Sequence, residues 1–181
     1  MHTKVVFRAA KALAGIGCAV LRFNFRGVGR SEGAFADGDG EADDFRAAVA
    51  FLAGRHPGLD LWAGGFSFGA WIASRAASVD PRISTYVGIG LTVNRYEFAE
   101  LRGSGKPKFL IHGERDEICP LRAVRVFYGE LTEPKELVVI DGADHLFDGR
   151  VSEVGDAIGD LLADYHPPDG ASEARFRSKE P

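Results

Sequence analysis

Two spacings of apolar positions alternate along this chain. Apolar side chains that recur every three or four residues predict helices, which cover residues 3–15, 39 to 54–57, 67–78, 121–131 and 151–165. Short continuous apolar runs predict strands that are buried on both faces, and they cover residues 18–25, 59–65, 84–90, 108–113 and 136–140. The chain therefore predicts five strands that alternate with helices.

Strands joined in this way form a parallel sheet, because a parallel pair needs a crossover connection and right-handed crossovers place helices on both faces. We predict the α/β class, with a three-layer parallel sheet of about five strands. A chain of 181 residues can bury one sizeable core, so we expect one domain over residues 1–166. The polar residues 167–181 predict a disordered tail.

Composition and charge exclude several classes of partner. The formal net charge is -4, which argues against binding to nucleic acid or to an anionic membrane surface. Basic residues interrupt the N-terminal apolar positions and no run is long enough for a membrane span, so we expect a cytoplasmic protein. Cys18 and Cys119 lie far apart and outside any metal-binding spacing, so we expect no metal and no cofactor.

The segment Gly65-Phe66-Ser67-Phe68-Gly69 lies where a predicted strand gives way to a helix. A serine on such a sharp turn has a strained backbone, projects above the sheet and needs small neighbours two positions away on each side. Ser67 is therefore a candidate nucleophile. The alternative is that Ser67 simply caps the helix that follows it.

Two more candidates follow later strands, at the edge of the sheet where chemistry gathers in α/β folds. Asp116 comes shortly after strand 108–113, and His145 follows strand 136–140. A serine hydroxyl needs a base to take its proton, and that base needs an acceptor to orient it. Rival acids and bases are also present, and these are Asp141, Asp144, His2, His56, His112 and His166.

The glycines at 27, 29 and 33 invite comparison with a dinucleotide-binding loop. The third glycine of that motif would stand at position 32, which is Glu32, and no helix is predicted to begin there. We therefore expect a loop over the edge of the sheet.

Four segments together resemble the α/β-hydrolase superfamily, and within it the small bacterial hydrolases related to dienelactone hydrolase. These segments are Leu21–Ser31, Gly65–Gly69, His112–Asp116 and Gly142–His145. The resemblance implies that Ser67 is the nucleophile, His145 the general base and then acid, and Asp116 the carboxylate that orients His145. It implies a homologous region from residue 2 to about 165.

The resemblance also implies a difference at the N-terminus. Family members begin with about three further strands, one of which lies between the equivalents of strands 18–25 and 59–65. Without it, either strand 18–25 shifts into the slot or the exposed edges pair with a second chain, and we predict a homodimer. The loop after that strand carries an oxyanion donor, so we expect weak turnover, or a true start upstream of Met1, unless the N–H of His2 or Thr3 substitutes.

The function that we predict is a serine hydrolase that cleaves small carboxylic esters through an acyl-enzyme. The Phe68 N–H is expected to bind the oxyanion. Phe66 and Phe147 are expected to contact the substrate, and the short connection 91–107 leaves the site uncovered, which suits small esters. The alternative is an incomplete hydrolase-fold protein that acts as a binding or assembly subunit.

Overall fold

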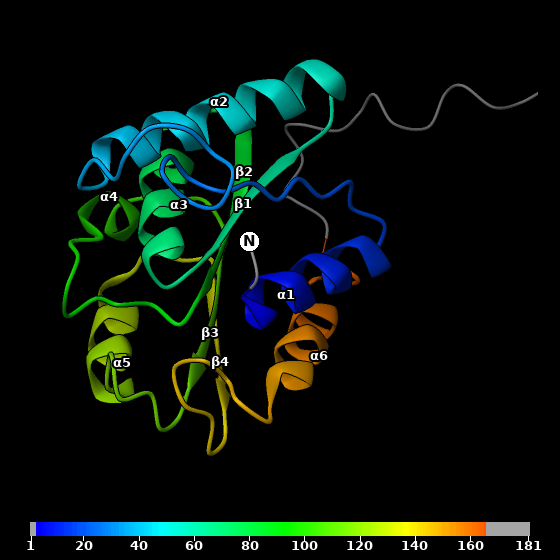
Figure 1. Ribbon diagram of the computed structural model, residues 1–181. Helices are drawn as coiled ribbons and strands as arrows, with labels where there is room; N and C mark the ends of the chain where they lie inside the picture. The colour runs from blue at the N-terminus through cyan, green and yellow to red at the C-terminus, as the bar shows by residue number, and fades with distance from the viewer. Residues whose placement is uncertain (1–2, 166–181) are drawn as a thin grey trace, which may run out of the picture.

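Four parallel strands form one sheet in the computed structural model, which describes residues 3–165 (Figure 1). Their order in the sheet is also their order in the chain: β1 (Leu61–Phe66), β2 (Ile83–Ile89), β3 (Lys108–Gly113) and β4 (Lys135–Ile140). Ile89 pairs with Phe66 on one side and with Ile111 on the other. The carboxyl ends of all four strands therefore meet at one edge of the sheet.

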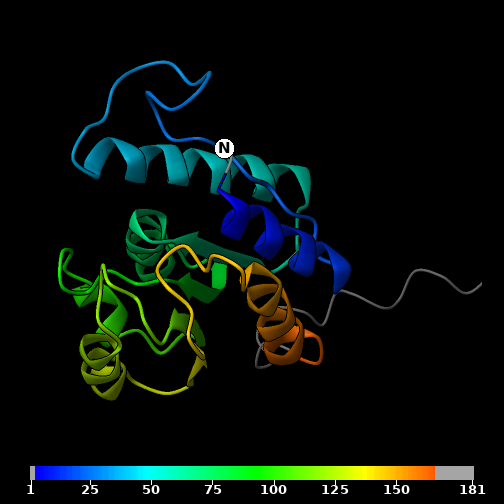
Figure 2. The same ribbon diagram turned by 60° about the horizontal axis from the view of Figure 1, so that its bottom comes forward.

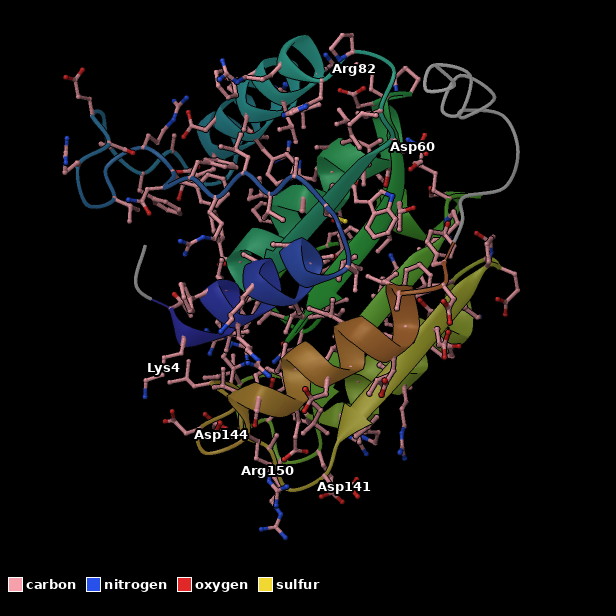
Figure 3. All side chains as sticks on the ribbon, turned by 90° about the vertical axis from the view of Figure 1, so that its right-hand side faces the viewer. Lys4, Asp60, Arg82, Asp141, Asp144 and Arg150 are labelled. Atoms are coloured by element: carbon pink, nitrogen blue, oxygen red, sulfur yellow. The ribbon has the colours of Figure 1, made fainter. Side chains whose placement is uncertain are left out.

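Six helices accompany the sheet: α1 (Lys4–Gly15), α2 (Asp39–Arg55), α3 (Phe68–Val79), α4 (Ala99–Arg102), α5 (Leu121–Glu130) and α6 (Val151–Leu162). Helices α1 and α6 pack side by side on one face of the sheet (Figures 2 and 3). Helices α2, α3 and α5 cover the other face. None of the helices within residues 3–165 is long and apolar enough to cross a membrane.

Each face of the sheet has its own hydrophobic core. Successive strand residues point to opposite faces, so Tyr86 belongs to the core under α2, α3 and α5, and Val87 to the core under α1 and α6. Leu110 and Ile111 of β3 divide in the same way. Burial on both faces explains why the strands read as continuous apolar runs.

The strand predicted over residues 18–25 is wrong. This segment has no regular secondary structure, and β1 pairs with β2 alone among the described residues. Strand 18–25 has therefore not shifted next to β1. Its apolar side chains serve packing instead, because Phe23 and Phe25 lie against the core and Phe23 contacts Phe45. An apolar run becomes a strand only where a neighbouring backbone supplies the ladder of hydrogen bonds.

Helix α2 begins with Asp39 as its first residue, and Gly38 takes the N-cap position with a φ of 100°. The carboxylate of Glu41 accepts the Gly38 N–H at 2.9 Å, which satisfies a donor at the start of the helix. Gly38, and not Asp39, is therefore the residue that caps α2. The tail expected over 167–181, and also His2 and His166, lie outside the described residues.

Candidate active site

Ser67 lies on the tight turn between β1 and α3, with φ 54° and ψ -119°. This positive φ is costly for a residue with a side chain and is held by the surrounding structure. A Cβ on Gly65 would lie 2.1 Å from the Gly69 carbonyl oxygen, so the turn requires glycine there. A Cβ on Gly69 would come no closer than 4.0 Å to a ring carbon of Phe25, so the expected demand for a small residue holds at Gly65 only.

Three of the predicted residues lie in hydrogen-bonding contact, although Ser67 and His145 are 78 positions apart. The Oγ of Ser67 is 2.9 Å from Nε2 of His145. The Nδ1 of His145 is 2.7 Å from Oδ2 of Asp116. With the proton on Nδ1, His145 donates to the carboxylate and offers Nε2 as the acceptor for the serine hydroxyl.

Asp116 is buried at the start of the β3–α5 connection, and both of its oxygens are used. Its Oδ1 accepts the backbone N–H groups of Ile118 at 2.9 Å and Cys119 at 2.8 Å. Burial alone would raise the pKa of Asp116, but the hydrogen bonds from His145 and the Cys119 N–H outweigh it and lower the pKa. The carboxylate is therefore ionised at neutral pH and fixed in orientation.

The rival acids occupy other positions in the loop between β4 and α6, where Figure 3 labels both. The Oδ1 of Asp144 accepts the Asp148 N–H at 2.9 Å within that loop, and Asp141 is exposed. Among the described histidines, His112 is fully buried beneath Asp116, and His56 is the C-cap of α2. Neither of these two histidines is hydrogen-bonded to Ser67 in the structure.

Phe68 is the first residue of α3, so its N–H has no acceptor within the helix and lies at the positive end of the helix dipole. This position suits the binding of a developing negative charge beside Ser67. Of the two residues expected to supply a second donor, His2 lies outside the described residues and Thr3 is the N-cap of α1.

Aromatic side chains surround the site. The ring of Phe66 is half-buried and lies 5.1 Å from the His145 ring, centroid to centroid. Phe147 does not line an open surface, because it is completely buried in the core under α1 and α6. Phe147 is therefore not accessible for the contact with substrate that the sequence predicted. Its backbone has a positive φ of 55°, two positions after His145.

The structure adds two aromatic neighbours that the sequence reasoning missed. The Phe68 ring lies 5.8 Å from the ring of Phe25 and 5.7 Å from that of Phe35. Phe35 is 64% exposed, although it is a large apolar side chain. The signal available in the sequence was a phenylalanine within a segment rich in glycine and acidic residues.

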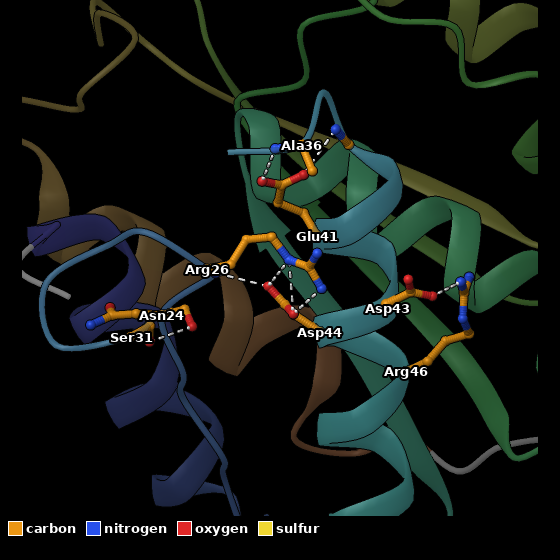
Figure 4. Close-up of polar contacts among 9 residues, drawn as sticks. Asn24, Arg26, Ser31, Ala36, Glu41, Asp43, Asp44 and Arg46 are labelled. Atoms are coloured by element: carbon orange, nitrogen blue, oxygen red, sulfur yellow. Dashed lines mark hydrogen bonds and ion pairs between the residues drawn. The ribbon is translucent and has the colours of Figure 1, made fainter. Parts of the chain in front are cut away.

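The loop that carries Phe35 is tied to α2 by charged side chains (Figure 4). Arg26 forms a two-pronged contact with Asp44, with its Nη2 2.8 Å from Oδ1. Glu41 accepts the Ala36 N–H at 3.0 Å. The glycine-rich segment is therefore a loop anchored to α2 beside the site.

A groove of about 470 Å³ lies elsewhere, between β4 and α6. Acidic and apolar side chains line it together with Arg150, and Ser67, Asp116 and His145 do not contribute to it. Within residues 3–165, no group of three or more histidine, cysteine or carboxylate side chains could hold a metal ion.

Known proteins resemble this chain over most of its length. The serine aminopeptidase S33 family matches residues 1–94. An uncharacterized protein of Rickettsia prowazekii (strain Madrid E) is 35% identical over 195 residues, covering 99% of this chain and 81% of that protein.

Two solved structures share both sequence and fold with it. An α/β serine hydrolase homologue from Coxiella burnetii is 36% identical, with a TM-score of 0.85 over 90% of this chain and 77% of the other. A serine hydrolase from Xanthomonas campestris, described as having no lid, is also 36% identical, with a TM-score of 0.80 over 88% and 72% of the two chains. The chain therefore belongs to the α/β-hydrolase superfamily, in the family of serine hydrolases that includes the S33 serine aminopeptidases.

Proposed function

We propose that this protein hydrolyses esters of small carboxylic acids through an acyl-enzyme on Ser67. The observation that carries the proposal is the position of His145, whose two ring nitrogens contact Ser67 Oγ at 2.9 Å and Asp116 Oδ2 at 2.7 Å. A base that is held in this way can take the serine proton, and the buried carboxylate stabilises the cation that forms.

In the first half of the reaction, Ser67 Oγ attacks the ester carbonyl carbon while its proton passes to His145 Nε2. The carbonyl oxygen becomes an oxyanion, and the Phe68 N–H, at the start of α3, donates a hydrogen bond to it. The tetrahedral intermediate then collapses, the bond to the alkoxy group breaks, and His145 gives its proton to the departing alcohol. The acyl group remains on Ser67.

Water completes the cycle. His145 takes a proton from a water molecule as the water oxygen attacks the acyl carbon, and collapse of the second intermediate breaks the bond to Ser67 Oγ. His145 returns the proton to Ser67, and the carboxylic acid leaves. The contacts of His145 with Ser67 at 2.9 Å and with Asp116 at 2.7 Å support these proton transfers.

Two features favour a small substrate. The connection between β2 and β3 contains only the short helix α4, and the Xanthomonas campestris relative is described as a hydrolase without a lid. Aromatic rings beside Ser67, above all those of Phe66 and Phe68, provide an apolar surface for a short acyl group.

Loss of one oxyanion donor typically costs about 100- to 1000-fold in turnover, so we expect slow catalysis if Phe68 acts alone.

The test is hydrolysis of p-nitrophenyl acetate and butyrate by the purified protein beside Ser67→Ala, with labelling by a fluorophosphonate as a second readout. We expect saturable hydrolysis and labelling by the unchanged protein and neither by the variant. Equal rates in both proteins and no labelling would contradict the proposal and favour a binding or assembly role.

A further inference from the structure

We propose that Glu114 and Glu117 are positioning residues, which hold the loop that carries His145 against the loop that carries Asp116. The first loop is residues 141–147, after β4, and the second is residues 114–119, after β3. The consequence for turnover rests on the proposed function, whereas the contact between the loops is a property of the folded chain. The reaction chemistry described above assigns neither glutamate a role.

Backbone groups bring the two loops together first. The Glu114 N–H donates to the Ile140 carbonyl at 3.0 Å, and the Arg115 N–H donates to the Ala143 carbonyl at 2.8 Å. Gly113 permits this approach, because a Cβ there would lie 2.5 Å from the Ala143 oxygen. The loops are thus in direct contact at the end of β3.

The two carboxylates then bind backbone donors of the opposite loop. Oε2 of Glu114 accepts the Gly142 N–H at 2.8 Å. Oε2 of Glu117 accepts the N–H of His145 itself at 3.3 Å. Hydrogen bonds to an ionised acceptor are stronger than those between neutral groups. The two glutamates together bind the first and the last residue of the segment 142–145.

Glu117 links the two halves of the site because it is the neighbour of Asp116. Asp116 Oδ1 is held by the N–H groups of Ile118 and Cys119, so the loop 114–119 fixes the carboxylate that receives His145 Nδ1. The same short loop, through Glu117, also holds the backbone of His145. One segment therefore sets both partners of the 2.7 Å contact.

The expected effect is on turnover rather than on substrate binding, because both glutamates bind the loop that carries His145. The proposed acyl surface of Phe66 and Phe68 belongs to β1 and α3. A displacement of about 1 Å at a catalytic group can cost about 100-fold. We expect Glu117→Ala to lower kcat for p-nitrophenyl acetate about tenfold and to leave KM within about twofold. Glu117→Gln keeps an oxygen that accepts the same N–H, and it should restore most of the lost kcat.

Glu114→Ala should have a smaller effect than Glu117→Ala, and the double variant a larger one than either. The matched control is Glu136→Ala, which removes an exposed carboxylate at the opposite end of β4. A kcat for Glu117→Ala equal to that of Glu136→Ala would overturn the proposal. So would failure of Glu117→Gln to exceed Glu117→Ala.

Amide hydrogen exchange of residues 141–147 separates this proposal from the proposed function. We expect exchange in this segment to be several-fold faster in the Glu114→Ala/Glu117→Ala double variant than in the unchanged protein or in Glu136→Ala. Faster exchange in a protein no more active than Ser67→Ala would support the contact and contradict the esterase. Unchanged exchange would overturn the contact, whatever the activity.

Discussion

The imidazole Nε2 of His112 lies 3.5 Å from Asp116 Oδ2, and both side chains are fully buried. The same nitrogen is 2.8 Å from the carbonyl oxygen of Cys119, to which it donates its proton. Asp116 Oδ2 also receives His145, so a second histidine lies directly beneath the candidate active site. His112 thereby holds Cys119, the last residue of the loop 114–119 that carries Asp116.

Removal of the His112 hydrogen bond should destabilise the fold. In His112→Leu the buried Cys119 carbonyl loses its donor, which typically costs about 1–3 kcal/mol. His112→Gln retains an N–H donor on a side chain of similar reach and should recover part of that loss. Urea unfolding at pH 7 measures the difference, and equal stability of the two variants would contradict this role.

Stability should also fall in mild acid because of the same histidine. Burial lowers the pKa of His112 below its ordinary value of 6.5, so below that pH the unfolded chain binds a proton that the folded chain does not. The contribution of neutral His112 to the free energy of unfolding is therefore complete above the pKa of the unfolded chain. It is lost as the pH falls from that pKa toward the lower pKa of the folded protein. Urea unfolding between pH 7 and 5 should show a steeper loss in the unchanged protein than in His112→Gln. The same dependence of the free energy of unfolding on pH in both proteins would contradict this role of His112.

Asp116→Asn should reduce turnover strongly without preventing folding. The amide cannot stabilise the imidazolium, and it favours the wrong tautomer of His145, an effect of about 10⁴-fold in a serine protease. Asp141→Asn is the matched control, since it removes one exposed carboxylate from the loop that carries His145. The measurement is the rate of p-nitrophenyl acetate hydrolysis by the two variants. Similar rates would contradict a role for Asp116 in the reaction.

The free edge of β1 predicts association between copies. Among the described residues β1 pairs with β2 only, and unpaired strand edges favour pairing with another chain. The apolar side chains of Val20, Leu21 and Leu59 are also exposed. We expect a homodimer in sedimentation at micromolar concentration. A monomer under those conditions would exclude edge pairing at that strength.

Local pattern was sufficient for most helices and strands. The apolar stripe of α6 and the continuous apolar runs of β1 to β4 depend on which face each residue buries, and that information lies within a short window. Residues 18–25 carry the same signal without a strand, because pairing depends on a neighbour that no local pattern shows. Phe147 was misplaced for a related reason, since proximity to His145 in sequence does not tell which way its side chain turns.

The sequence by itself determined the class of fold, the strained serine turn at Gly65–Gly69 and the three residue types of the site, in the order serine, aspartate, histidine. Each depends on side-chain chemistry and on short-range spacing. Only the tertiary structure decided that Asp116 rather than Asp141 or Asp144 receives His145, and that Glu117 binds the backbone of the same histidine. Those contacts join loops from different strands, and their distances are set by the packing of the whole sheet.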